Sequence, residues 1–135
     1  MKLLNFAIIA LLSTTSFIAC NKNDSNTAPA PSTNAVEGVY TGKYGFDNET
    51  PDKNYTLKFS GSNTIQEIGQ SSGHPTGKGT YTLKGNHISA SYTMLFSPYN
   101  DYFIEATYDA TNKTITGTWG YNAGGTDGGK FSLHK

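Results

Sequence analysis

Apolar or aromatic residues alternate with Thr, Ser and Lys along most of the chain beyond residue 36. A period of two is typical of strands with one buried face, and no long stretch of the chain carries a helical period. Gly, Asn and Pro interrupt the alternation at short intervals, as turn residues do between strands. This pattern predicts eight strands, at residues 39–46, 54–60, 63–69, 79–84, 87–96, 102–109, 114–120 and 130–134.

The connections between these strands are mostly short. Gly61-Ser62 and Gly85-Asn86 suit tight hairpins, because Gly and Asn tolerate positive φ. Pro51, Pro75 and Pro98 all fall in predicted loops. The sequence therefore predicts an all-β domain, a single antiparallel up-and-down meander of about eight strands. Closing it into a small barrel removes both exposed edges, and an open or sandwich-like sheet is the alternative.

The first 20 residues read as a targeting segment rather than as part of the fold. Lys2 precedes a short apolar stretch, 3–12, which is too short to span a bilayer. The stretch Phe17-Ile18-Ala19-Cys20 resembles the lipobox of bacterial lipoproteins. The resemblance implies a signal peptide at 1–19, a lipid (such as palmitate) on Cys20, and permanent anchoring in a membrane of the bacterial envelope.

Residues 20–35 separate the lipid from the domain. This stretch holds Asn, Ser, Thr, Ala and Pro but no large apolar residue, so it is predicted to be a flexible tether. In the lipoproteins that the lipobox resembles, an Asp directly after the lipidated Cys is the signal for retention in the inner membrane of enterobacteria. This chain has Asn21 at that position, and the absence of the signal favours the outer membrane. Both its periplasmic face and the cell surface stay open. The predicted barrel domain is residues 36–135.

The charge balance and the scarcity of reactive side chains exclude several classes of function. Ten Lys, no Arg and ten Asp plus Glu give a net charge of zero, which argues against nucleic acid as a partner. Cys20 is the single Cys, and His74, His87 and His134 are far apart in the sequence. No nucleophile elbow or metal-ligand spacing is present. We therefore predict a protein that is not an enzyme, with no catalytic residue, no cofactor and no metal.

Aromatic residues are the most informative feature of the predicted strands. An eight-stranded barrel is just wide enough to be filled by side chains or to hold one small ligand. If the interior is hollow, the candidate ligand-binding residues are Tyr55, Tyr81, Tyr92, Tyr108 and Trp119. A core filled completely by these rings is the other interpretation.

Tyrosines near the predicted loops suggest a second kind of site. Tyr99 and Tyr102 lie in a Ser-Pro-Tyr-Asn-Asp-Tyr run, and Tyr121 and Asn122 begin a glycine-rich loop. Exposed Tyr suits contact with a protein or glycan partner. These four residues are the candidate interaction residues of a module with a filled core.

Two short motifs add a family resemblance. Gly38-Val39-Tyr40 is similar to the Gly-x-Trp that opens the first strand of lipocalins and avidins, and Gly117-Thr118-Trp119 repeats it late in the chain. Together with the lipobox and the tether, residues 36–135 resemble the lipocalin-like barrels of small Bacteroidetes-type lipoproteins. The resemblance implies a binding module for a small apolar or amphipathic ligand in the mouth of a barrel.

Overall fold

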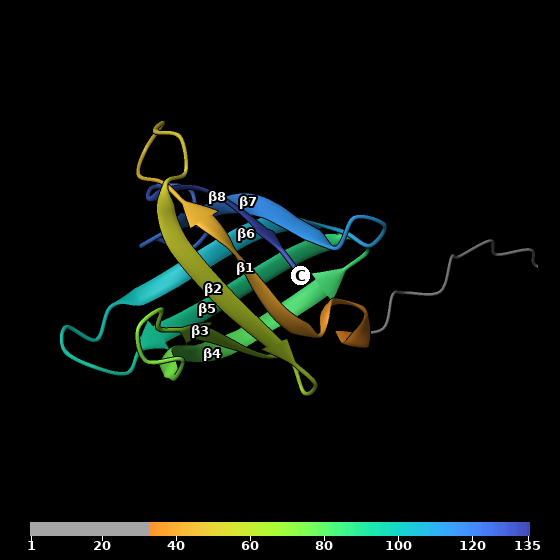
Figure 1. Cartoon of the computed structure of the whole chain (residues 1–135), viewed down its shortest axis with the longest axis horizontal. Coiled ribbons are helices and arrows are strands. Elements are labelled where there is room, and N and C mark those ends of the chain that lie inside the picture. Colours follow the sequence, from red (N-terminus) through yellow and green to blue (C-terminus); the bar gives the residue numbers. More distant parts are fainter. Residues whose placement is uncertain (1–32) are drawn as a thin grey trace, which may run out of the picture.

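The computed structural model describes residues 33–135, which form a short 3-10 helix followed by eight antiparallel strands (Figure 1). Each strand pairs with the next, and β8 pairs with β1, so the barrel is closed. The predicted all-β meander is confirmed, and the open or sandwich-like alternative is wrong. The elements are η1 (Thr33–Val36), β1 (Gly38–Tyr44), β2 (Lys53–Ser60), β3 (Thr64–Ile68), β4 (Pro75–Lys84), β5 (His87–Met94), β6 (Asp101–Asp109), β7 (Thr114–Gly120) and β8 (Gly129–His134).

The strand ends differ from the prediction by a few residues. The largest difference is β4, which begins at Pro75 rather than Gly79, so the assignment of Pro75 to a loop is wrong. Proline is tolerated at the first residue of a strand because its missing N–H is not needed there. The pairing of β3 with β4 also shifts register between Glu67 and Ile68, close to this proline.

The predicted signal peptide at 1–19 and Cys20 lie outside the described residues, so their assignments stay predictions. Most of the predicted tether lies there too. Its last residues, 33–35, belong to η1, and Val36 at the end of this helix is fully buried. No helix in residues 33–135 has the length and apolar character needed to cross a membrane.

The two ends of the barrel are built differently. Three short connections, at 61–63, 85–86 and 110–113, lie at one end together with η1 and the C-terminus. We call this the closed end. Four longer loops, at 45–52, 69–74, 95–100 and 121–128, lie at the opposite end, which we call the mouth. Figure 1 shows the mouth at the left and the closed end at the right.

The closed end is filled by packed rings. Phe59 meets Tyr40 and Tyr81 edge to face, with ring centroids 5.8 and 5.1 Å apart. The Tyr108 hydroxyl donates a hydrogen bond of 2.9 Å to the backbone carbonyl of Ala35 in η1. This bond joins β6 to the helix that covers the closed end, and Val36, the last residue of that helix, is fully buried in the core.

Inward-facing glycines let neighbouring strands approach closely. Gly79 lies opposite Ile65 on one side and Tyr92 on the other, both of which point into the barrel. A Cβ atom at Gly79 would meet the backbone carbonyl oxygen of Ser91 on β5. A side chain is therefore excluded there, and the backbones of β4 and β5 can bend together around the core.

We predict that Gly79→Ala destabilises the barrel by about 3 kcal/mol, because the added methyl group meets backbone that cannot move independently. Gly61→Ala is the matched control, since a Cβ atom there meets only the flexible carboxylate end of Glu37, at 3.0 Å. Urea unfolding of both variants measures the difference. Equal free energies of unfolding would show that the close approach at Gly79 is not a constraint.

Candidate functional site

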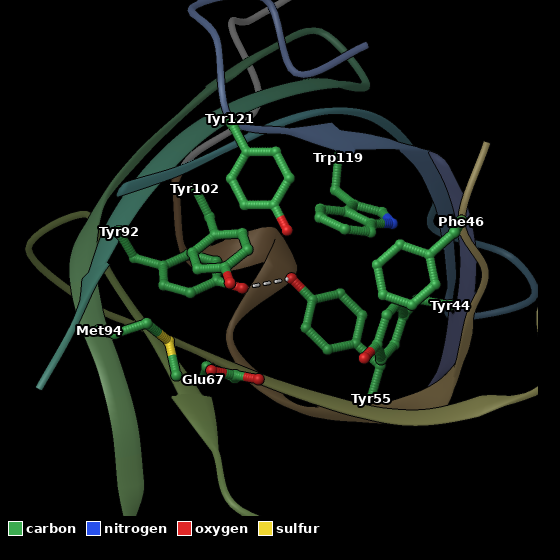
Figure 2. A pocket seen from close by; sticks show the side chains of 9 residues that line it. All are labelled: Tyr44, Phe46, Tyr55, Glu67, Tyr92, Met94, Tyr102, Trp119 and Tyr121. Carbon is green, nitrogen blue, oxygen red and sulfur yellow. Dashed lines mark hydrogen bonds between the residues drawn. The ribbon is translucent and has the colours of Figure 1, made fainter. Parts of the chain in front are cut away.

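A pocket of about 80 Å³ opens in the barrel interior on the mouth side of the closed-end core (Figure 2). Seven of its nine lining side chains are aromatic, and the other two are a carboxylate and a thioether. The lining residues are Tyr44, Phe46, Tyr55, Glu67, Tyr92, Met94, Tyr102, Trp119 and Tyr121. The barrel interior is thus filled at one end and hollow at the other.

Strand alternation explains how these side chains meet. Tyr44, Tyr55 and Trp119 come from β1, β2 and β7, each at an inward position near the strand end that faces the mouth. The absence of a side chain at Gly77 makes space for the ring of Tyr92, since a Cβ atom at Gly77 would lie 2.6 Å from that ring. The ring of Tyr92 therefore lies over bare backbone of β4.

Two buried hydroxyls meet beside the pocket. The Tyr55 and Tyr92 oxygens are 3.0 Å apart and share a hydrogen bond, which is drawn in Figure 2. Burial raises the pKa of both phenols, so both stay neutral near pH 7. Tyr92 also stacks on Tyr102, with centroids 5.3 Å apart and planes inclined by 14°. These rings form a neutral and rigid wall.

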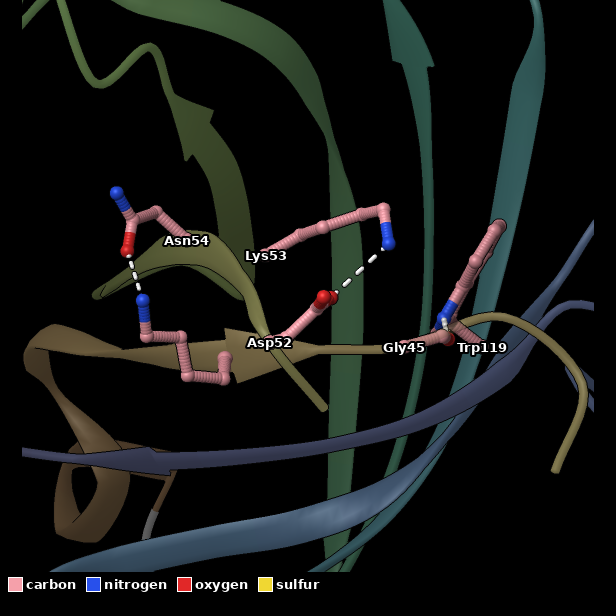
Figure 3. Close-up of polar contacts among 6 residues, drawn as sticks. Gly45, Asp52, Lys53, Asn54 and Trp119 are labelled. Atoms are coloured by element: carbon pink, nitrogen blue, oxygen red, sulfur yellow. Dashed lines mark hydrogen bonds and ion pairs between the residues drawn. The ribbon is translucent and has the colours of Figure 1, made fainter. Parts of the chain in front are cut away.

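Trp119 is fixed by its indole nitrogen. Its Nε1 donates a 3.0 Å hydrogen bond to the backbone carbonyl of Gly45, shown in Figure 3. This bond holds the start of loop 45–52 against β7. The indole ring lies edge to face with Tyr44, Phe46 and Tyr121, at centroid distances of 5.4 to 5.6 Å. The ring is thereby set in one orientation at the pocket.

Glu67 is the one carboxylic acid among the lining residues. Its side chain is half-buried on β3, next to rings that offer a carboxylate little solvation. Burial raises the pKa of Glu67 above its usual range, and a 3.1 Å hydrogen bond from the Thr76 hydroxyl to its Oε2 opposes this in part. The pocket thus combines aromatic surfaces with one carboxylate.

The rim of the mouth is acidic. Its four loops carry Asp47, Glu49, Asp52 and Asp127 and no Lys. Lys53, at the first position of β2, lies 2.9 Å from the carboxylate of Asp52, the ion pair drawn in Figure 3. Charges of one sign around an opening raise the local concentration of the opposite sign.

The predicted ligand-binding residues divide between the two ends of the barrel. Tyr55, Tyr92 and Trp119 come together in the pocket. Tyr81 and Tyr108 do not line it, because they point inward at the closed end, where they pack against Phe59 and Tyr40. The interpretation of a filled core therefore describes the closed end, and the interpretation of a hollow interior describes the mouth.

The predicted interaction residues also divide. Tyr102 is the second residue of β6 and lines the pocket, and Tyr121, which follows β7, lies over it with centroids 5.3 Å apart. Asn122 is exposed, and its side-chain amide donates to the carboxylate of Asp127, which orders loop 121–128. Tyr99 is the most exposed of the three tyrosines, with 70% of its surface accessible, and it does not line the pocket.

Sequence reasoning missed four pocket residues. Tyr44, Glu67 and Met94 continue the inward alternation of their strands by one step, so a strict period of two could have found them. Glu67 was not predicted to point inward because inward positions of a strand are expected to be apolar. Phe46 lies two residues beyond Tyr44 and inside the predicted strand 39–46, so the same period reaches it, although β1 ends at Tyr44 and Phe46 belongs to the loop that follows.

Two further results bear on the site. Among residues 33–135, no group of three or more His, Cys, Asp and Glu side chains is placed to hold a metal ion. Comparisons with protein-family models, with curated proteins and with solved structures find no match for this chain. The resemblance to lipocalin-like lipoproteins therefore stays a prediction, and the pocket must be interpreted from its own chemistry.

We predict that Glu67→Gln stabilises the fold near pH 7. Because burial raises the pKa of Glu67 in the folded state, its contribution to stability is complete below the pKa of the unfolded chain, about 4.3, and is lost as the pH rises through the folded-state pKa. The variant should therefore melt at a higher temperature than the parent at pH 7.5, with a smaller difference at pH 4.

Glu49→Gln, an exposed rim carboxylate with the same change of charge, is the control for this measurement. A general effect of net charge would raise the melting temperature of both variants equally. That outcome, or a Glu67→Gln variant less stable than the parent at pH 7.5, would contradict the assignment of a desolvated carboxylate.

Proposed function

We propose that this protein is a non-enzymatic binding module, which holds one small ligand in the mouth of its barrel. The observation that supports this most is the contrast between the two ends. The closed end buries its rings against one another, whereas the same kind of side chain at the mouth leaves a pocket of about 80 Å³. Preformed concave sites lined by rings and few polar groups are typical of ligand-binding proteins.

The volume limits what enters. Sites that enclose a whole drug-sized ligand measure about 300–1,000 Å³. A pocket of about 80 Å³ has room for a group of a few non-hydrogen atoms. The rest of a larger amphipathic ligand would lie between the loops, where Phe46 and Tyr121 are 37% and 49% exposed.

The proposal includes a lipid anchor on Cys20, in the outer membrane of a bacterial envelope. The described chain begins in η1 at the closed end (Figure 1). A tether that enters there is attached at the end opposite the mouth and leaves the mouth unobstructed. The site would then be accessible to a ligand.

The first test is a native mass spectrum of the full chain purified from its own host envelope. We expect an added mass that disappears on denaturation. Tyr121→Ala should lower the bound fraction about tenfold, because removal of a large ring from a binding site typically costs one to a few kcal/mol. Tyr99→Ala is the matched control, since Tyr99 is exposed at the mouth but does not line the pocket.

Two results together would overturn the proposal. One is a chain without added mass. The other is an emission of Trp119, the single Trp, that a small-molecule extract of the host leaves unchanged. A bound mass that both tyrosine variants retain in full would place the ligand elsewhere.

A second candidate function rests on loop 95–100. Leu95, Phe96 and Tyr99 expose 52%, 50% and 70% of their surfaces within this one loop at the mouth. Exposed apolar clusters mark surfaces that contact partners. If the protein acts through a protein or glycan partner instead, Tyr99→Ala should abolish capture of that partner and Tyr121→Ala should weaken it less.

A further inference from the structure

We propose that the group bound in the mouth is a small organic cation, an ammonium carrying short alkyl groups. The aromatic rings of the pocket would surround its alkyl groups, and Glu67 would balance its charge. This inference rests on the proposed function, because it names the chemical class of the ligand for the same pocket. It is carried by the rings, by Glu67 and by the charges of the rim.

The rings provide the surface that a cation prefers. The π face of Trp, Tyr or Phe attracts a cation within about 6 Å of its centroid, and several such faces around one space form a cage for alkylated ammonium groups. Trp119, Tyr102 and Tyr121 contact one another at centroid distances of 5.3 to 5.9 Å on one side of the pocket. Figure 2 shows Tyr55 and Tyr44 on another side, with their rings toward the same space.

The rim already holds one cation on a ring. The ammonium nitrogen of Lys53 lies 5.1 Å from the centroid of Phe46, which also lines the pocket. This contact lies outside the cage, and Asp52 balances the lysine's charge. A lining ring of this site thus takes a cation on its face within the chain itself.

Glu67 provides the charge that the cage lacks. An ionised carboxylate taken out of water is costly unless an opposite charge accompanies it. Within residues 33–135 this carboxylate forms no ion pair, and its hydrogen bond comes from the neutral hydroxyl of Thr76. A bound ammonium would supply the missing partner at the point where the pocket is hollow.

The long-range charge distribution favours the same class of ligand. The mouth loops carry four carboxylates and no Lys, and Lys43, Lys53 and Lys130 at the adjoining strand ends offset part of this charge. At the closed end, Lys84, Lys113 and Lys135 accompany Glu37 and Asp109. The excess of carboxylates around the mouth therefore favours a cation over an anion.

Other ligand classes fit the pocket less well. A neutral apolar group could fill the volume but would leave Glu67 without a partner. An anion would meet Glu67 itself. A calcium ion takes six to eight oxygen ligands, and this lining offers one carboxylate among rings and a thioether.

The test compares choline with 3,3-dimethyl-1-butanol, which has the same shape with a neutral carbon in place of the charged nitrogen. Both are titrated into the full chain, in a detergent without ammonium groups, and followed by Trp119 emission and by calorimetry. We expect choline to bind at least tenfold more tightly. Equal affinity for the two compounds would overturn the cation assignment but leave a small-ligand site in place.

Glu67→Gln separates the carboxylate from the shape of the pocket. The variant should lose about tenfold or more in choline affinity and keep its affinity for the neutral compound. Glu105→Gln, on the outer face of β6 and 2.7 Å from His87, is the control and should bind as the parent does. Circular dichroism establishes that both variants fold.

Two further outcomes would overturn the inference. The first is an unchanged choline affinity in Glu67→Gln. The second is a parent chain that binds neither compound. In that case the native mass spectrum described above still decides independently whether the mouth holds a small ligand of another class.

Discussion

An eight-stranded barrel has an interior that its own inward-pointing side chains just fill, and this geometric constraint governs the rest of the structure. The side chain at each inward position either fills part of the interior or leaves part of it empty. At the closed end, Tyr40, Phe59 and Tyr81 fill it, with Val36 of η1 beneath them. At the mouth the aromatic side chains are as large as those at the closed end, but they line a cavity instead of filling it. The division into a solid half and a hollow half follows from this choice of side chains.

The hollow half contains an arrangement that stability alone does not explain. A carboxylate among aromatic rings lowers stability when it ionises, and a glutamine or leucine at the same place would avoid that cost. Residues that oppose local stability are expected at functional sites. Glu67 fits this description, because its pKa is raised by burial and its one hydrogen-bonding neighbour in the described chain, Thr76, is neutral. In the proposed complex, Glu67 balances the charge of the bound ammonium.

The sequence predicted the architecture well because alternation is a strong local signal. Tyr55, Leu57 and Phe59 point the same way in β2 as their spacing requires, and the predicted turn at Gly85, with a φ of +65°, joins β4 to β5. At 61–63 the positive φ angles are those of Ser62 and Asn63 rather than of Gly61. Alternation says which face a residue occupies but not at which height along the barrel axis it lies. For that reason Tyr81 and Tyr108 could not be separated from Tyr92 before the register of the strands was known.

The site depends on features that local patterns do not encode. Glu67 is polar in a position where a pattern of apolar residues is sought. Tyr121 joins the pocket because Asp127 accepts a 2.8 Å hydrogen bond from its backbone N–H, a contact between residues six apart in an irregular loop. Such contacts are tertiary, and only the folded chain reveals them.

We propose that Glu67 is a partly desolvated carboxylate that pairs with the charge of a bound cation. Its carboxyl carbon-13 shift, followed through a pH titration with and without saturating choline, tests this most directly. We expect Glu67 of the free protein to titrate above the usual range of a glutamate, because burial raises its pKa, and we expect choline to lower that pKa. A Glu67 that titrates together with exposed glutamates, and whose pKa choline leaves unmoved, would contradict it.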